Sequence, residues 1–168
     1  MKISCFTDLF DETFLTESPF LSHFIKGHLM LEFLMLKCVE ITFPEKMNHA
    51  EKLTHFNLII FLYDNNIIPL KLKDILISIN RMRNKFAHNI AYEPSIREYE
   101  EILLEAKSFS HDMTDGILQT LEEVKDKKIL GECESSIFVE PFLQLSYDLH
   151  SIYQENGGDW ENFIKKDY

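Results

Sequence analysis

The feature that most constrains the fold is a long apolar stretch with a proline at each end. Ser18 before Pro19 is typical of a helix start, because serine caps free N–H groups and proline fits the first turn. Pro44 ends the helix, since the residue before a proline avoids helical geometry. A helix that is apolar on most sides must be buried, so residues 19–43 are predicted to form a central helix. Its apolar residues are Leu21, Phe24, Ile25, Leu29, Leu31, Phe33, Leu34, Leu36 and Val39.

Further helices are predicted from capping signals and apolar spacing. Ser95 followed by Glu98 is typical of a capping box. Pro69 opens a helix whose apolar residues recur every three or four positions up to Phe86, and Asn48 is a candidate cap for the helix before it. The expected helices are 49–65, 69–88, 95–109, 111–128 and 134–155, with short ones at 6–16 and 160–166, and residues 136–139 could instead be extended.

These signals together predict an all-α fold, an antiparallel bundle of four to six helices in a single domain of residues 1–168. The chain has only five Gly and five Pro, which favours long helices over a loop-rich β fold. Apolar residues make up 45% of it, enough for a core. Residues 19–128 are expected to form this core, and residues 129–168 an acidic helical extension.

The charge of the chain is distributed unevenly. Residues 1–92 carry ten basic and ten acidic residues, whereas residues 93–168 carry seven basic and eighteen acidic ones, which accounts for the net charge of −11. Residues 71–88 hold five basic residues against Asp74 alone. A small basic patch on an acidic protein can bind an anion locally. It does not suit nucleic-acid binding over a wide surface, which needs many phosphate contacts.

Cysteine spacing and hydropathy bear on where the protein acts. The three cysteines lack a CxxC spacing and fit reduced thiols in a cytoplasmic protein. The N-terminus lacks the apolar run of a signal peptide. No stretch of about 18 uninterrupted apolar residues is present, so no membrane span is expected.

The segment 81–88 is where the sequence indicates chemistry, because it contains Arg81, Arg83, Asn84, Lys85 and His88. On an ideal helix Arg83 lies at the edge of the apolar face, and Arg83 and His88 point about 140° apart. Two arrangements would bring this pair to one substrate. Either the helix loosens at His88, just before the loop, or two copies of the helix meet so that arginine and histidine from both chains line one groove. The second arrangement predicts a homodimer.

An arginine and a histidine with this spacing suit cleavage of RNA by its own 2′-hydroxyl. Histidine changes protonation near neutral pH and can take the hydroxyl proton. Arginine binds phosphate oxygens and offsets the charge that builds at phosphorus. Asn84 would orient the histidine or a phosphate oxygen. The residues expected to bind substrate are Arg81, Lys85 and Lys73, and neither a metal nor a cofactor is called for.

The segment 83–88, Arg-Asn-Lys-Phe-Ala-His, resembles the Arg-x4-His motif of the HEPN superfamily (higher eukaryotes and prokaryotes nucleotide-binding). Gly27-His28 with Glu32 is similar to a subgroup of small stand-alone bacterial members. The resemblance covers residues 19–105 and implies a four- to five-helix bundle, a dimer and often a metal-independent ribonuclease of toxin–antitoxin or other defence systems. It implies catalytic roles for Arg83 and His88 and an accessory role for Asn84.

The chain departs from one branch of the superfamily, whose antitoxin is a nucleotidyltransferase. That branch has Tyr two residues after the histidine, where this chain has Ile90, with Tyr92 nearby.

Each of these side chains also has a purely structural interpretation. Arg83 can pair with an acid on the helix surface, and His88 can cap a helix C-terminus, where a cation is favourable. His28 and Glu32, one turn apart, could be metal ligands. A buried hydrogen bond between them is favoured over that. His49 and His55 lack a third ligand at a recognisable spacing.

Three hypotheses for function follow. The first is a homodimeric HEPN ribonuclease that acts on RNA and is controlled by an antitoxin or regulator protein. The second is a non-catalytic HEPN-like protein that binds a nucleotide or a partner through the same groove, since the acidic surface repels RNA. The third is an acidic C-terminal half that folds over the basic groove as an internal inhibitor.

Overall fold

The computed structural model describes residues 19–89, 92–109 and 115–165. Within these ranges the chain forms helices and turns, with a single isolated β-bridge between Gly158 and Lys165. The prediction of an all-α bundle is confirmed. In the part of the chain that the structure describes, no helix is long and apolar enough to cross a membrane.

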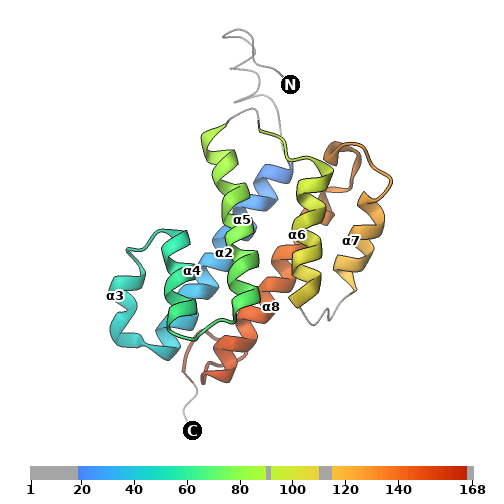
Figure 1. The fold of residues 1–168 in the computed structure, drawn as a ribbon. Coiled ribbons are helices and arrows are strands. Elements are labelled where there is room, and N and C mark those ends of the chain that lie inside the picture. Colours follow the sequence, from blue (N-terminus) through green and yellow to red (C-terminus); the bar gives the residue numbers. More distant parts are fainter. Residues whose placement is uncertain (1–18, 90–91, 110–114, 166–168) are drawn as a thin grey trace.

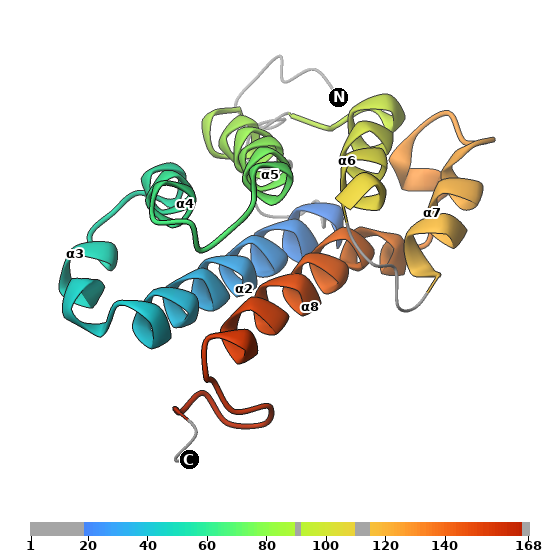
Figure 2. The same ribbon diagram turned by 60° about the horizontal axis from the view of Figure 1, so that its bottom comes forward.

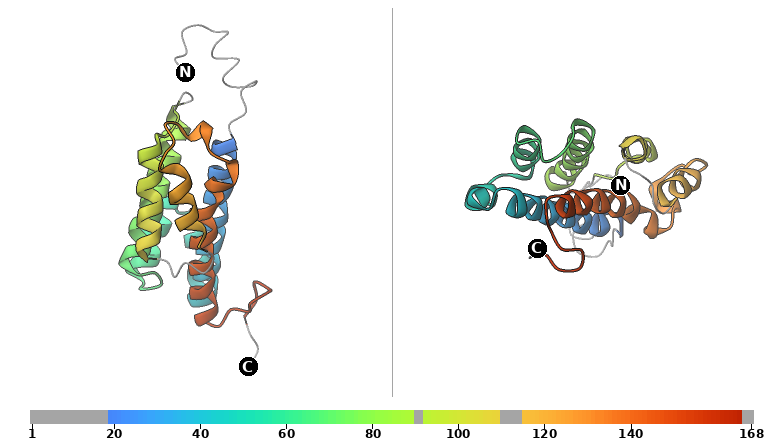
Figure 3. Two further views of the ribbon diagram at one scale, coloured as in Figure 1. Left: turned by 90° about the vertical axis from the view of Figure 1, so that its right-hand side faces the viewer. Right: turned by 90° about the horizontal axis from the view of Figure 1, so that it is seen from below.

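The helices lie in two layers (Figures 1, 2 and 3). One layer is a pair, α2 (Pro19–Thr42) and α8 (Glu140–Glu155). The other holds α4 (His55–Asp64), α5 (Leu70–His88) and α6 (Ile96–Phe109). The short α3 (Met47–Ala50) and α7 (Gly116–Val124) lie at the two sides of the bundle. Three 3-10 turns complete it: η2 (Pro44–Lys46), η3 (Leu130–Glu132) and η4 (Ser135–Val139).

The long apolar stretch forms α2, close to its predicted limits of 19 and 43, and much of it is buried. Neighbouring α2 and α5 run in opposite directions, because Phe24 near the start of α2 packs against Phe86 near the end of α5. Not every neighbouring pair is antiparallel. Phe24 of α2 packs on Phe142 of α8, and farther along Cys38 Sγ lies 3.4 Å from the Leu149 carbonyl, so α2 and α8 run parallel.

The C-terminal region supplies part of the core. The sequence placed residues 129–168 outside it, whereas Phe142, Leu145, Leu149 and Tyr153 of α8 are all at most 2% exposed. Their burial against α2 follows from the amphipathic pattern of α8, which matches that of the other core helices. This helix is therefore a structural element of the bundle.

The capping box at the start of α6 forms as predicted. The Glu98 N–H donates to Ser95 Oγ at 3.2 Å, and the Ser95 N–H donates to Glu98 Oε2 at 2.8 Å. These two bonds satisfy free N–H groups at both positions of the box. They fix where the chain turns into α6 after the loop that follows α5.

Several predicted boundaries differ from the structure. The helix expected at 49–65 is two elements, because Thr54 rather than Asn48 caps α4 and accepts a hydrogen bond from the Asn57 N–H. The helix expected at 134–155 begins only at Glu140, where Pro141 occupies the first turn. Residues 160–165 are not helical. The helix expected at 111–128 is reduced to α7 where it is described, and the one expected at 6–16 lies outside the described residues.

Candidate functional site

The end of α5 carries the predicted catalytic residues. Arg83 and Asn84 are half-buried, and Arg83 Nη1 donates to Asn84 Oδ1 at 3.3 Å. His88 lies on the last turn and is exposed. The helix stays regular to this point, because the Asn89 N–H donates to the Lys85 carbonyl at 3.0 Å. Arg83 and His88 therefore remain about 140° apart around one helix and about 7.5 Å apart along its axis.

The regular end of α5 bears on the two arrangements that would unite Arg83 and His88. Loosening of the helix at His88 is not seen, since α5 includes that residue. Within one chain, the two side chains therefore leave the helix in different directions.

The three residues expected to bind substrate differ in their surroundings. Arg81 is exposed. Lys85 Nζ lies 2.7 Å from Glu98 Oε1. Lys73 Nζ lies 3.3 Å from Asp74 Oδ1 and 4.4 Å from the centre of the Tyr63 ring. Two of the three cations are thus partly neutralised by the chain itself, which lowers the positive potential available to an anion near α5.

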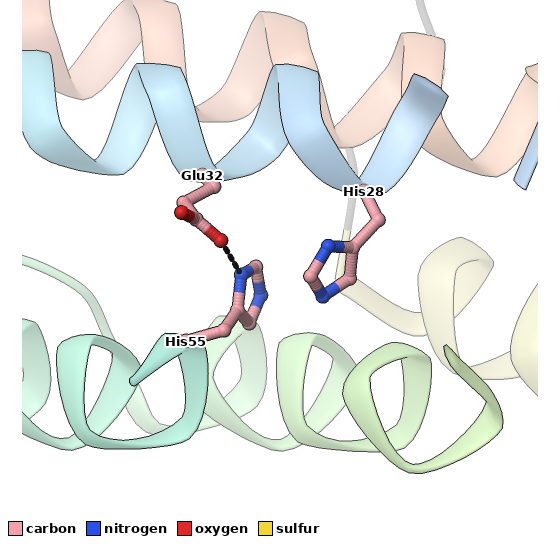
Figure 4. A group of neighbouring side chains, drawn as sticks. All are labelled: His28, Glu32 and His55. Atoms are coloured by element: carbon pink, nitrogen blue, oxygen red, sulfur yellow. Dashed lines mark hydrogen bonds and ion pairs between the residues drawn. The ribbon is translucent and has the colours of Figure 1, made fainter. Parts of the chain in front are cut away.

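A second group of polar side chains lies in the interior, between α2, α4 and α5. His28 and Glu32 come from α2 and His55 is the first residue of α4 (Figure 4). His55 Nδ1 lies 2.9 Å from Glu32 Oε2, and the two imidazole rings stack with centroids 3.7 Å apart. We name this group the histidine–glutamate cluster.

The two histidine side chains of the histidine–glutamate cluster are almost closed to solvent. His28 is 3% exposed and the His55 side chain 7%, whereas the Glu32 side chain is 39% exposed. Among the described residues, neither His28 Nε2 nor His55 Nε2 has a hydrogen-bond partner. A buried polar atom left without a partner costs about 1–3 kcal/mol, so these two nitrogens need an explanation.

Burial determines the charge state of the cluster. Desolvation, together with the nearby His55 and Arg83, lowers the pKa of His28 to about 3, against the effect of a hydrogen bond with the Asn80 side chain. Desolvation also lowers the pKa of His55, which its hydrogen bond to Glu32 and the carboxylate charge partly oppose. Both rings are therefore neutral at pH 7, each with one lone pair available. The Arg83 guanidinium is near enough to both rings to contribute to the lowering of their pKa values.

The sequence did not identify the partner that holds this cluster together. It favoured a hydrogen bond between His28 and Glu32, one turn apart on α2, whereas Glu32 binds His55 from α4. It gave Asn80 no role, although Asn80 is 6% exposed and contacts His28. A buried asparagine on the apolar stripe of α5 was the available signal, because buried amides are nearly always hydrogen-bonded.

The described part of the chain also has a surface hollow of about 560 Å³, lined by residues such as Ile68, Pro69 and Ile152. It lies at the start of α5, whereas His88 lies at the end of that helix, roughly 27 Å away along its axis. The hollow is therefore separate from the predicted catalytic residues.

Comparisons of the chain with protein-family models, with curated proteins and with solved structures find no match in any of the three. The fold and its side chains define the chain as an all-α bundle with an Arg-x4-His segment at the end of one helix and a buried histidine–glutamate cluster beside it.

Proposed function

We propose that this chain is a metal-independent RNA endonuclease of the HEPN type that works as a homodimer in the cytoplasm. Arg83 of one protomer and His88 of the other would share each site. A role in toxin–antitoxin or anti-phage defence follows from the resemblance, with an antitoxin or regulator protein as partner. The observation that carries the proposal is the regular α5, which presents both motif residues while keeping them on different faces.

The proposed reaction uses side chains alone. His88 takes the proton of the 2′-hydroxyl, whose oxygen attacks the neighbouring phosphorus. The bond from phosphorus to the 5′ oxygen breaks, and that oxygen receives a proton. Arg83 binds the phosphate oxygens and offsets the charge of the transition state, while Asn84, in contact with Arg83, holds the guanidinium in place. The products are a 2′,3′-cyclic phosphate and a 5′-hydroxyl.

Subunit exchange tests the composite site. Purified protein is incubated with RNA in EDTA, and the ends are mapped. Arg83→Ala and His88→Ala should each abolish cleavage, whereas Arg97→Ala and His49→Ala, at exposed positions elsewhere, should keep it. When the two inactive variants are mixed and exchange subunits, each mixed dimer regains one intact site. Up to about a quarter of the wild-type activity should return.

Each result of this experiment has a clear meaning. Cleavage that persists in His88→Ala would show that another group does the chemistry. Loss in both variants without recovery in the mixture, with exchange shown by differently tagged chains, would place both residues in one protomer or assign them separate roles.

A second function, binding without catalysis, is favoured by one specific observation. Lys85 and Lys73 are already engaged with Glu98 and Asp74. A surface with few free cations suits a nucleotide or an acidic partner segment better than a long RNA strand. In that case RNA stays intact at high protein concentration, and Arg83→Ala abolishes nucleotide binding measured by calorimetry. Cleavage in EDTA that Arg83→Ala removes would reject this alternative.

The internal-inhibitor hypothesis has less support. Truncation after Phe109 would remove α8, whose apolar side chains are buried against α2. We therefore expect the truncated chain to unfold rather than to gain activity.

A further inference from the structure

We propose that His28, Glu32 and His55 form a binding site for one divalent transition-metal ion of the zinc class at the contact between α2 and α4. This inference goes beyond the proposed function, since the ion would stabilise the fold and take no part in RNA cleavage. The three residues offer one donor atom each, and these atoms all lie within 4.8 Å of one another. Two imidazoles and one carboxylate are a ligand set typical of zinc.

The topology brings together ligands that are distant in the chain. His28 and Glu32 stand one turn apart on α2, so they share a face of that helix. His55 starts α4 and points toward them across the interface (Figure 4). An ion here would link α2 to the segment that follows α3. The site therefore has the form of a clamp between two elements of the bundle.

The unpartnered Nε2 atom of His28 is the second observation. His28 is 3% exposed, and in the described part of the chain its Nε2 atom has no hydrogen-bond partner. Neutral imidazole is the form that binds metal, and burial keeps both rings neutral at pH 7. Half-exposed Glu32 leaves a route by which a small ion can enter from solvent.

The distances require only small side-chain movements. Zinc binds nitrogen and carboxylate oxygen at about 2.0–2.2 Å, which sets tetrahedral ligands about 3.3 Å apart. His55 Nδ1 and Glu32 Oε2 are already 2.9 Å apart. Their present hydrogen bond places the ring proton on Nδ1, so binding through Nδ1 moves that proton to Nε2. Both rings stay neutral and no net proton is released. His28 completes the set by rotation, and water takes the fourth position.

Two neighbours adjust the affinity. Asn80 holds the His28 ring through a hydrogen bond, so it is a positioning residue for that ligand. The Arg83 guanidinium is close enough to oppose positive charge on both rings, and it opposes a cation in the same way. We therefore expect Arg83→Gln to bind the ion more tightly and Asn80→Ala to bind it about 10- to 100-fold more weakly. A buried cluster that binds no ion would show neither the tighter binding in Arg83→Gln nor the weaker binding in Asn80→Ala.

The test uses the full chain, freed of metal by chelation and titrated with Zn²⁺ in a calorimeter. Co²⁺ serves as a spectroscopic probe, because nitrogen and oxygen ligands give visible d–d bands without the thiolate charge-transfer bands that binding at a cysteine would give. We expect one ion per chain and a rise in the melting temperature on binding. His28→Gln, His55→Gln and Glu32→Gln should each weaken binding at least tenfold, whereas His49→Gln, an exposed histidine elsewhere, should not.

Several outcomes would overturn the proposal. They are an absence of binding at about 100 μM Zn²⁺, binding that all three ligand variants retain, and a Co²⁺ spectrum with thiolate bands. If His28→Gln does not fold, half-exposed Glu32→Gln still decides the matter, because that change leaves the core intact. His88→Ala should bind zinc normally. Loss of cleavage in that variant and loss of zinc binding in the ligand variants are thus separate results.

Discussion

The rings of His28 and His55 lie face to face across the contact of α2 with α4, with centroids 3.7 Å and planes 27° apart. Protonation of either ring is unfavourable in this arrangement. Both pKa values lie below the ordinary value of 6.5, that of His28 at about 3, because burial and the nearby Arg83 guanidinium oppose protonation more than Glu32 and Asn80 favour it. The unfolded chain therefore binds more protons than the folded chain at mildly acidic pH.

The first prediction is a loss of stability with acid in metal-free protein. The contribution of this histidine pair to the free energy of unfolding should be constant above about pH 7. It should decrease as the pH falls below 6.5 toward 3, by up to about 1.4 kcal/mol per pH unit for His28. Urea denaturation at pH 7, 6 and 5 in a chelator measures it. In this window most carboxylates stay ionised, so the slope reports histidines.

Two variants separate this buried pair from the other histidines. His28→Gln should reduce the slope between pH 7 and 5, and His49→Gln, at an exposed position of α3, should leave it unchanged. Equal stability of the wild type at pH 7 and pH 5 would contradict the prediction.

The second prediction concerns the close contact of α2 with α8. A Cβ placed on Gly27 would lie 2.2 Å from Cγ of Phe142. Alanine in a helix normally stabilises it relative to glycine by roughly 1 kcal/mol. Here we expect Gly27→Ala to destabilise the protein by about 1–3 kcal/mol, because the two helices must move apart. Chemical denaturation measures the change.

The control for Gly27→Ala is Gly131→Ala, since a Cβ there meets its nearest neighbouring atom at 4.0 Å. We expect this change to be close to neutral. The sign of the change in the free energy of unfolding decides the prediction for Gly27. A stabilised Gly27→Ala variant would show that α2 and α8 are not packed as described.

Much of the fold could be predicted from local signals in the sequence, such as capping residues and prolines. The capping box of Ser95 and Glu98 formed as predicted, because both partners lie within one turn of chain. The limits of α2 were close for the same reason, since they depend on nearby prolines. Thr54 was overlooked as a cap because Asn48, six residues earlier, carries an equally good capping side chain. Choosing between them depends on tertiary packing.

Contacts between distant residues could not be predicted in this way. The role of α8 rests on its fit against α2, and its acidic residues obscured its apolar face. The hydrogen bond between Glu32 and His55 joins two helices, and the sequence around either residue does not identify the other as its partner. The spacing of Arg83 and His88 could be found in the sequence, but a helical wheel places only the side chains of one helix. It says nothing about the second chain that the proposed site needs.

The third prediction tests a buried link between α6 and the turn before α8. The Tyr99 hydroxyl donates to the Ile137 carbonyl, and Tyr99 is fully buried. Tyr99→Phe leaves that carbonyl without its partner, so we expect a loss of about 1–3 kcal/mol in the free energy of unfolding. Tyr147→Phe, at a residue that is 39% exposed, is the matched control and should change little. Similar effects of the two substitutions would contradict the role assigned to this hydrogen bond.

The fourth prediction joins the ion pair at the end of α5 to the proposed RNA binding. Glu98 accepts hydrogen bonds from Lys85 Nζ, Tyr92 Oη and Ser95, which hold its pKa at about 2. Glu98→Gln keeps a residue suited to the capping box but weakens the hold on Lys85. If Lys85 then contacts phosphate, single-stranded RNA should bind more tightly at low salt. The slope of log K against log salt should steepen by about 0.7.

The matched control for Glu98→Gln is Glu101→Gln, which makes the same change in net charge. It releases Arg97 from an exposed pair at 3.1 Å on the outer face of α6. Fluorescence anisotropy with a labelled RNA, using His88→Ala as the background to prevent cleavage, measures both variants across a salt series. Equal changes in the two would show that only net charge matters and that Lys85 makes no phosphate contact. A steeper slope in Glu98→Gln alone would place RNA at the end of α5, where Arg83 and His88 lie.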